Sequence, residues 1–321
     1  MSIQDTRAVV LGGAGFLGSH LCERLLMCNV EKLIIVDDFS LGCMNNIKSL
    51  SGLPNCIIRK IDASNHKSML RVCNEDQPDV VFNLAVISLP ESLVKPKESV
   101  DTNILITSTA CELLRQEKYK TLIHVSSSEA YGTAIYTDKS MSENHPTAPK
   151  TPYAASKLAS DHIVLSYYKT FGVDVSIARP FNMYGPRQNQ GTYAGVIPIT
   201  INRIMNKQPP VIQGDGLQTR DYSYVLDVAS VIPEFYENTA TRGKVINIAS
   251  GREITIKKII HMIMDIMGYS GDVIYSDARP GDVKRHCGDI TLARVLLGYE
   301  PTTSFEEGLK RTVEWYVEGK I

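Results

Sequence analysis

Short apolar runs alternate with longer amphipathic stretches along the first 180 residues of the chain. The apolar runs are rich in β-branched residues, as buried strands are, and they lie at 8–13, 32–38, 56–62, 79–86, 121–127 and 174–180. Between them, apolar residues recur at helical spacing over 19–27, 67–75, 99–116 and 151–171. This alternation predicts a Rossmann-type α/β fold, a doubly wound parallel sheet with helices on both faces.

Turn-forming residues divide the rest of the chain into shorter elements. They gather at 184–191, 207–210, 213–216 and 278–282. We therefore expect a first domain over residues 1–180 and a smaller α/β domain, mainly for substrate binding, over 181–321. The run at 244–250 again has the character of a buried strand, so about 215–250 is expected to return to the first domain.

A cluster of glycines follows the first predicted strand and opens the first predicted helix. Gly13, Gly15 and Gly18 have the spacing G-x-G-x-x-G, and Gly12 adds a further glycine at the turn. Glycine permits the tight turn and lets backbone N–H groups and a helix N-terminus approach a pyrophosphate. The strand and the helix around this triplet predict a dinucleotide-binding site, which the triplet alone would not.

Acidic residues after the next two predicted strands refine this interpretation. Asp37 and Asp38 end the second strand, about where an acidic side chain binds the ribose hydroxyls of adenosine. No Arg or Lys follows before Lys48, and Asp37 would repel a 2′-phosphate, so NAD is favoured over NADP. Asp62, after the third strand, would either contact the adenine or cap the next helix.

Composition and charge narrow the class of partner. The chain is 43% hydrophobic and 21% charged, enough apolar residues for a sizeable core. A net charge of −1 and scattered basic residues argue against nucleic acid or an anionic membrane as a partner, and no apolar run approaches a membrane span. We expect a small-molecule ligand, no metal site and, with seven cysteines but no C-x-x-C pair, a cytoplasmic location.

Two polar motifs supply candidate chemistry. Tyr153 and Lys157 are four residues apart near the start of a predicted helix, so both side chains lie on one face. A tyrosine has an unperturbed pKa of about 10 and acts as a base near neutral pH only beside a cation, which Lys157 supplies. The stretch VSSSEAYGTA, residues 125–134, adds three hydroxyls and a carboxylate where a predicted strand ends.

Four motifs together resemble the extended short-chain dehydrogenase/reductase family that acts on nucleotide sugars. They are GGAGFLG, SSSEAYG, YAASK and RPFNMYGPRQ, and segments 213–227 and 278–282 extend the resemblance to nearly the whole chain. It implies NAD as cofactor and a nucleotide-diphosphate sugar as substrate. It also implies a homodimer, in which helices at about 98–117 and 153–171 of two copies form a four-helix bundle.

The resemblance implies roles for individual residues. Tyr153 would accept the proton of the sugar O4 while hydride leaves C4, Ser127 would hydrogen-bond the same oxygen, and Lys157 would also bind the nicotinamide ribose. The implied cofactor-binding residues are Gly12, Gly15, Phe16, Leu17, Gly18, Asp37, Asp38, Asp62, Ala63, Leu84, Ala85, Asn103, Tyr153 and Lys157. The implied substrate-binding residues are Asn182, Arg187, Arg220 and Arg279.

The step after C4 oxidation separates the possible reactions. Glu129 resembles the carboxylate with which 4,6-dehydratases remove the C5 proton, and Ser128 would then help to protonate the departing O6. The resemblance therefore favours a 4,6-dehydratase. Residues 191–198 resemble a segment of N-acetylhexosamine 4-epimerases, which keeps a 4-epimerase as the alternative. A uronic-acid decarboxylase and a non-catalytic nucleotide-sugar- or NAD-binding subunit are weaker alternatives.

Two departures from the family pattern concern the loop beside the sugar. Asn83 stands where many members have His, and the loop before Pro96 is about one residue shorter than in common epimerases and dehydratases. The identity of the sugar and of the base therefore does not follow from the resemblance.

Overall fold

A seven-stranded parallel sheet forms the larger part of the molecule. The computed structural model describes residues 1–136, 138–189, 195–278 and 283–319. The strand order is β10-β6-β5-β4-β1-β2-β3, and every neighbouring pair is parallel. Its strands are β1 (Arg7–Leu11), β2 (Lys32–Asp37), β3 (Cys56–Lys60), β4 (Val80–Asn83), β5 (Thr121–Val125), β6 (Asp174–Pro180) and β10 (Val245–Ile248).

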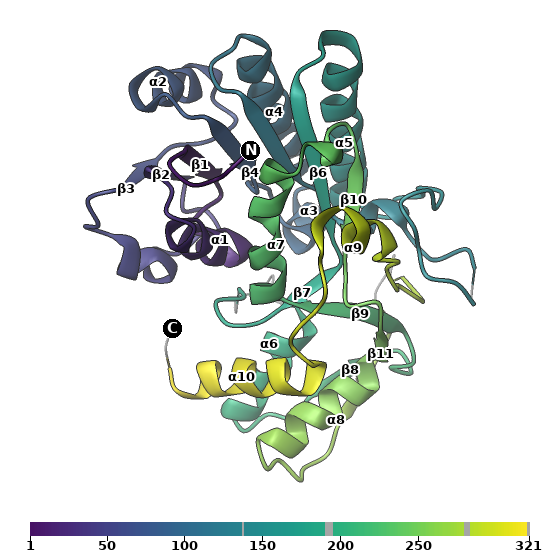
Figure 1. Cartoon of the computed structure of the whole chain (residues 1–321). Helices are drawn as coiled ribbons and strands as arrows, with labels where there is room; N and C mark the ends of the chain where they lie inside the picture. The colour runs from purple at the N-terminus through teal and green to yellow at the C-terminus, as the bar shows by residue number, and fades with distance from the viewer. Residues whose placement is uncertain (137, 190–194, 279–282, 320–321) are drawn as a thin grey trace.

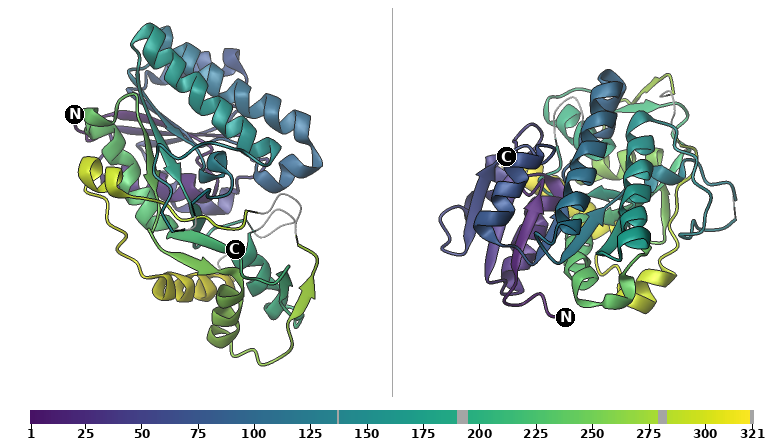
Figure 2. Two further views of the ribbon diagram at one scale, coloured as in Figure 1. Left: turned by 90° about the vertical axis from the view of Figure 1, so that its right-hand side faces the viewer. Right: turned by 90° about the horizontal axis from the view of Figure 1, so that it is seen from above.

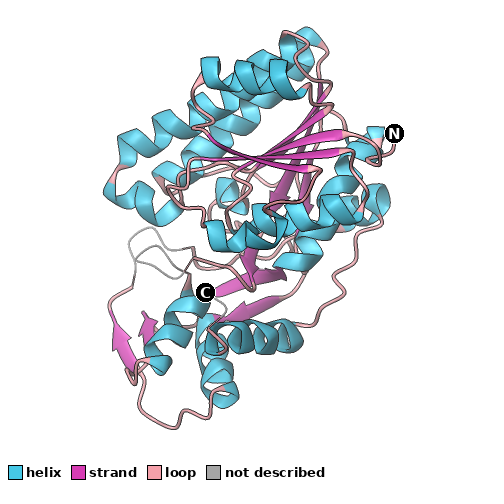
Figure 3. Ribbon diagram, turned by 90° about the vertical axis from the view of Figure 1, so that its left-hand side faces the viewer, coloured by secondary structure: helices cyan, strands magenta, loops and turns pink. Residues whose placement is uncertain are grey.

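Helices cover both faces of this sheet, which confirms the predicted doubly wound α/β fold (Figures 1 and 3). One face carries α1 (Phe16–Met27), α7 (Val225–Glu237) and α9 (Thr291–Leu297). The other carries α2 (His66–Asp76), α4 (Pro96–Arg115) and α5 (Pro152–Phe171), with the short α3 (Leu89–Val94) beside them. Three short 3-10 helices are η1 (Met44–Leu50), η2 (Ser128–Tyr131) and η3 (Thr239–Thr241).

Alternation of side chains along each strand explains the two helical layers. Val10 of β1 and Ile35 of β2 lie in one core cluster with the apolar faces of α1 and α7. Their neighbours Val9 and Ile34 point to the opposite face and pack with α2 and α4. Strands buried on both faces need apolar residues at every position, and this is why these segments read as continuous apolar runs.

A smaller lobe lies beyond the carboxyl ends of the strands (Figure 2). It contains a three-stranded sheet of β11 (Glu253–Thr255), β9 (Thr219–Tyr224) and β7 (Asn182–Tyr184), and a pair formed by β12 (Ile274–Ser276) and β8 (Val211–Gln213). Around them lie α6 (Val196–Met205), α8 (Ile256–Ile266) and α10 (Phe305–Val317), which share a separate apolar core. Within the described ranges, no helix is long and apolar enough to cross a membrane.

Candidate active site

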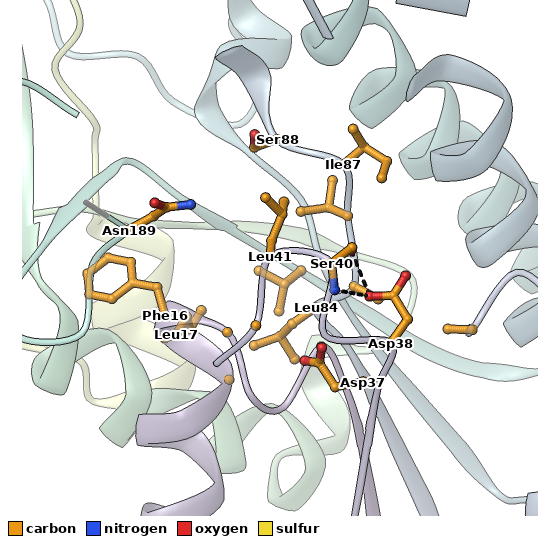
Figure 4. A pocket seen from close by; sticks show the side chains of 18 of the residues that line it. Phe16, Leu17, Asp37, Asp38, Ser40, Leu41, Leu84, Ile87, Ser88 and Asn189 are labelled. Atoms are coloured by element: carbon orange, nitrogen blue, oxygen red, sulfur yellow. Dashed lines mark hydrogen bonds between the residues drawn. The ribbon is translucent and has the colours of Figure 1, made fainter. Parts of the chain in front are cut away.

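A cavity of about 510 Å³ lies where the carboxyl ends of β1, β2, β4 and β5 meet the smaller lobe (Figure 4). Most residues expected to bind the cofactor line it. These are Gly12, Gly15, Phe16, Leu17, Gly18, Asp37, Asp38, Asp62, Ala63, Leu84, Ala85, Tyr153 and Lys157. The glycine cluster and the Tyr-Lys pair, predicted from separate motifs, therefore share one cavity.

At positions 12 and 18, the turn between β1 and α1 has no room for a side chain. A Cβ atom on Gly18 would lie 2.1 Å from the carbonyl oxygen of Gly12. Gly12 has a φ of +75°, and a Cβ there would lie 2.9 Å from the backbone nitrogen of Ala85. Gly15 caps α1 without a side chain, so the helix N-terminus faces the cavity with its backbone N–H groups accessible to an anion.

The acidic residues after β2 differ in environment. Asp37 is buried, and its carboxylate accepts hydrogen bonds from the backbone N–H groups of Ala14 (2.9 Å) and Phe39 (2.8 Å). Burial raises the pKa of Asp37, which these two hydrogen bonds oppose. Asp38 instead accepts from both the backbone and the hydroxyl of Ser40 (Figure 4). Each Asp37 oxygen keeps a lone pair, so this carboxylate can still accept from a ribose hydroxyl.

Tyr153 and Lys157 lie at the start of α5, where Thr151 caps the helix by accepting from the N–H of Ala154. Lys157 is 4% exposed, and its ammonium donates to the carbonyl of Val125, the last residue of β5, at 2.6 Å. Burial lowers the pKa of Lys157 to about 8, against the attraction of Asp161.

Tyr153 is held beside the serine-rich segment. Burial raises the pKa of Tyr153 to about 12, its hydrogen bond with Ser127 lowers that pKa, and the charge of Glu129 adds to the increase. The hydroxyl of Ser127 also accepts from the backbone N–H of Glu129 at 3.2 Å, because Ser127 caps η2 two residues after β5 ends. This turn therefore brings Ser127, Glu129 and Tyr153 together. Ser128 is 2% exposed and faces the interior.

The expected substrate residues fall in different places. Arg187 lines the cavity and forms an ion pair with Glu23 of α1 at 2.6 Å. The side-chain amide nitrogen of Asn182 is buried and has no hydrogen-bond partner among the described residues. Arg220 is 8% exposed, and one of its nitrogens donates to the carbonyls of Thr219 and Val283. Arg279 lies outside the described residues.

Asn103 is expected at the cofactor but does not line the cavity. Its side-chain oxygen accepts from the N–H of Ile87 (2.7 Å), and its amide donates to the carbonyl of Ile87 (3.3 Å) and the hydroxyl of Ser156 (2.9 Å). These bonds join α4, α5 and the loop after β4. Asn103 thus fixes the loop that brings Leu84 and Ala85 to the cavity.

Comparison with known proteins assigns the family. The family described as GDP-mannose 4,6 dehydratase matches residues 9–312. The chain belongs to this family. The match confirms the resemblance to extended short-chain dehydrogenases/reductases acting on nucleotide sugars.

Relatives within the family include both dehydratases and epimerases. A UDP-glucose 4-epimerase of Mycolicibacterium smegmatis is 31% identical over 97% of this chain and 98% of its own. The dTDP-glucose 4,6-dehydratase of Neisseria meningitidis serogroup B is 28% identical over 98% and 94%.

Solved structures divide in the same way. A UDP-N-acetylglucosamine 4-epimerase from Methanobrevibacter ruminantium M1, in complex with UDP-N-acetylmuramic acid, has a TM-score of 0.89 at 34% identity, covering 98% of this chain and 99% of its own. The dTDP-glucose 4,6-dehydratase DesIV from Streptomyces venezuelae, with NAD bound, has a TM-score of 0.91 at 28% identity, covering 98% of each chain. Overall fold therefore does not separate the two reactions within the family.

Several residues of this site were missed by sequence reasoning. Asn189 and Trp315 reach the cavity from the smaller lobe (Figure 4 shows Asn189), and only the folded chain brings them there. Asp161, His124 and Arg179 lie buried behind Tyr153 and Lys157. One signal was present for Asp161, since it continues the spacing of Tyr153 and Lys157 by four more residues along the helix.

Proposed function

We propose that this protein is an NAD-dependent 4,6-dehydratase of nucleotide-diphosphate hexoses, which yields a 4-keto-6-deoxy sugar. The placement of Glu129 carries the proposal. Its backbone N–H donates to Ser127, and its carboxylate is close enough to Tyr153 to raise the pKa of that phenol. A carboxylate beside the C4 machinery is what dehydration needs, whereas a 4-epimerase needs no further base.

The cavity fits NAD in three respects. The turn after β1, which accepts only glycine at positions 12 and 18, lets the backbone approach a pyrophosphate. Asp37 has acceptor capacity left for a ribose. The basic residues among those that line the cavity are Lys157 and Arg187, and Arg187 is paired with Glu23, which favours NAD over NADP. Bound NAD supplies the redox chemistry by accepting the C4 hydride and returning it to C6.

The residues of the chain handle the protons. Tyr153 takes the proton of the C4 hydroxyl, and Ser127 holds the same oxygen by a hydrogen bond. Lys157 stabilises the tyrosinate electrostatically, which offsets the cost of ionising a buried phenol. These three residues make the 4-ketone.

Glu129 then acts on the ketone. The carbonyl at C4 acidifies the C5 hydrogen, so the carboxylate of Glu129 can remove that proton while the C6 oxygen leaves as water. Glu129 then returns the proton to C5 when hydride reaches C6. Ser128 protonates the leaving oxygen in the proposed scheme, although its burial means that η2 must shift for Ser128 to reach a sugar. Asn182 and the arginines at 187, 220 and 279 are proposed to bind the nucleotide diphosphate.

A 4-epimerase is the second candidate. The relative of known structure at 34% identity is an epimerase, and it aligns over almost the whole of both chains. In that reaction the ketone would turn over and accept hydride on its other face, and Glu129 would have no chemical role.

Glu129→Gln separates the two reactions. Wild-type enzyme is incubated with UDP-, GDP-, CDP- and dTDP-sugars, and products are followed by mass spectrometry and NMR. Loss of one water indicates dehydration, and unchanged mass with a new sugar indicates epimerisation. We expect the rate of dehydration to be about 10²- to 10⁴-fold lower in the variant, while oxidation at C4 persists.

A matched control is Glu98→Gln, which removes an exposed carboxylate from α4 and should dehydrate normally. Normal dehydration by Glu129→Gln would contradict the proposed mechanism.

A homodimer forms part of the proposal. Helices α4 and α5 lie side by side on the outside of the molecule (Figure 2), and their surface includes Leu105 (52% exposed) and Phe171 (53% exposed). A second copy that packs its own α4 and α5 against them would bury these side chains in a four-helix bundle.

The seven free cysteines are consistent with a reducing compartment, and we include a cytoplasmic location in the proposal.

A further inference from the structure

Helix α5 carries a third polar residue on the face of the catalytic pair. Asp161 follows Tyr153 and Lys157 at successive steps of four residues, so the three side chains lie along one stripe of the helix. Asp161 is 1% exposed, and it lies deeper in the molecule than Tyr153. A carboxylate at such a position needs compensation by positive charge or by hydrogen bonds.

Its partners come from the strands beneath the helix. The carboxylate of Asp161 accepts from the hydroxyl of Ser126 at 2.7 Å and from the guanidinium of Arg179 at 2.6 Å. Arg179 is 3% exposed, and its guanidinium lies 4.5 Å from the ring centroid of Tyr131. Arg179 is thus held between a carboxylate and an aromatic face, and it stays charged because an arginine does not deprotonate in proteins.

His124 completes the group without adding charge. The amide nitrogen of Asn83 lies 3.2 Å from its Nδ1 and can only donate, so the ring proton is on Nε2. Nε2 faces the carboxylate of Asp161 at 3.8 Å. Burial, followed by the charges of Lys157 and Arg179, lowers the pKa of His124 well below its ordinary value, so the ring is neutral. The buried group therefore holds two cations, Lys157 and Arg179, and one anion.

We propose that Asp161 is a positioning residue whose carboxylate keeps Lys157 charged beneath Tyr153, and this inference rests on the proposed function. Without the carboxylate, two cations would share a buried site, and their repulsion is relieved most easily when Lys157 loses its proton. A neutral Lys157 no longer stabilises the tyrosinate that removes the O4 proton. Asp161 touches no reacting atom, and its support for the tyrosinate comes through Lys157, because its own charge raises the pKa of Tyr153.

Charged and titratable groups face this pair from each neighbouring element. Tyr153 lies on the same helix, His124 on β5, Arg179 on β6, and Tyr131 and Glu129 on η2. Asp161 raises the pKa of Lys157, which lies on the same stripe of the helix, and both Asp161 and Glu129 raise the pKa of Tyr153.

The test is the pH dependence of Asp161→Asn, which keeps the shape of the side chain and removes its charge. Reduction of bound NAD by a nucleotide sugar is followed from acidic to alkaline pH. We expect the alkaline limb of the profile to move to lower pH, because Lys157 then loses its proton more readily, and kcat at neutral pH to fall by roughly 10- to 100-fold. The KM for substrate should change little.

Asp76→Asn is the matched control, because Asp76 is also buried and pairs with Lys32 at 2.9 Å and Arg59 at 3.2 Å, far from the site in α2. It should lower stability and leave both limbs in place. Asp161→Glu restores the charge and should restore the alkaline limb. If Asp161→Asn does not fold, the pH profile of Asp161→Glu tests the proposal. A folded Asp161→Glu enzyme with a shifted alkaline limb overturns it.

An Asp161→Asn enzyme that loses stability but keeps the wild-type alkaline limb also overturns it. Failure of the proposed function gives a different result, because the wild-type enzyme then turns over no nucleotide sugar at all. If the wild-type enzyme epimerises instead of dehydrating, the inference stands, since both reactions begin with oxidation at C4.

Discussion

Gly18 illustrates how one missing side chain determines a binding site. The residue is in the first turn of α1, where a Cβ atom would meet the carbonyl oxygen of Gly12 at 2.1 Å and the Cα of Gly13 at 2.8 Å. These neighbours are backbone atoms, so no side chain can move aside to make room. The turn itself would have to open, and it forms the wall of the proposed pyrophosphate site.

Gly18→Ala should therefore weaken NAD binding by at least roughly tenfold, or about 1.4 kcal/mol, as measured by calorimetry on enzyme stripped of cofactor. Gly172→Ala is the control, because Gly172 has a φ of +68° with nothing within 4 Å of the added Cβ. It should cost about 1 kcal/mol of stability and leave NAD affinity unchanged. Equal loss of affinity in both variants would contradict the local explanation.

Local spacing explains which residues could be predicted from the sequence. Short motifs contain the residues that were predicted, which are the glycines, Asp37 and the pair Tyr153 and Lys157. In the structure, Gly12, Gly15, Gly18 and the other three line one cavity. Asp161 and Arg179 meet only because β6 packs beside β5 under α5, and a single sequence carries no signal of that contact. Residues that act through distant partners were accordingly missed.

Two of the predicted strands extend further than the strands in the structure. The predicted strand at 79–86 ends at Asn83, and that at 121–127 ends at Val125. After Asn83 the apolar pattern continues through Leu84, Ala85 and Val86, because these residues form a half-buried loop that lines the cavity. After Val125 the chain becomes polar at once, with Ser126 and Ser127. The hydrogen bonds of Asn103 to Ile87 replace the sheet partners that the loop after Asn83 lacks.

The outer surface of α4 and α5 is the proposed dimer interface, and a charge placed there tests it. Leu105→Glu places a charge in the proposed dimer interface, where burial of an unpaired carboxylate is unfavourable. We expect the wild-type protein to sediment as a dimer at micromolar concentration and the variant as a monomer. Val295→Glu alters a residue that is 74% exposed on α9, at the other face of the sheet, and should remain dimeric.

A monomeric wild-type protein would contradict the homodimer itself. A dimeric Leu105→Glu variant would instead exclude this surface as the interface.

Three of the buried histidines, His20, His124 and His286, make the stability of the whole molecule sensitive to acid. Burial lowers the pKa of His20 to about 4 and that of His286 to about 3, and it lowers the pKa of His124 as well. The unfolded chain takes up protons at these residues below pH 6.5, whereas the folded chain does not. Their contribution to stability is therefore complete above pH 6.5 and is lost as the pH falls toward the folded values.

Each histidine should remove up to about 1.4 kcal/mol of stability per pH unit well below 6.5, and Asp221, whose pKa burial raises to about 6, offsets part of this slope. Denaturant unfolding at pH 7, 6 and 5 measures this slope. His286→Gln should reduce the slope, and His261→Gln, at an exposed position, should leave it unchanged. A slope that is the same in His286→Gln as in the wild-type protein would refute this explanation.

The cavity is completed by a residue close to the end of the chain. Trp315 of α10 lines it together with the glycines between β1 and α1, about three hundred positions earlier in the sequence. One wall of the cavity therefore belongs to the smaller lobe and the other to the larger sheet. Any opening of the smaller lobe would expose the cofactor site to solvent, even with the seven-stranded sheet intact.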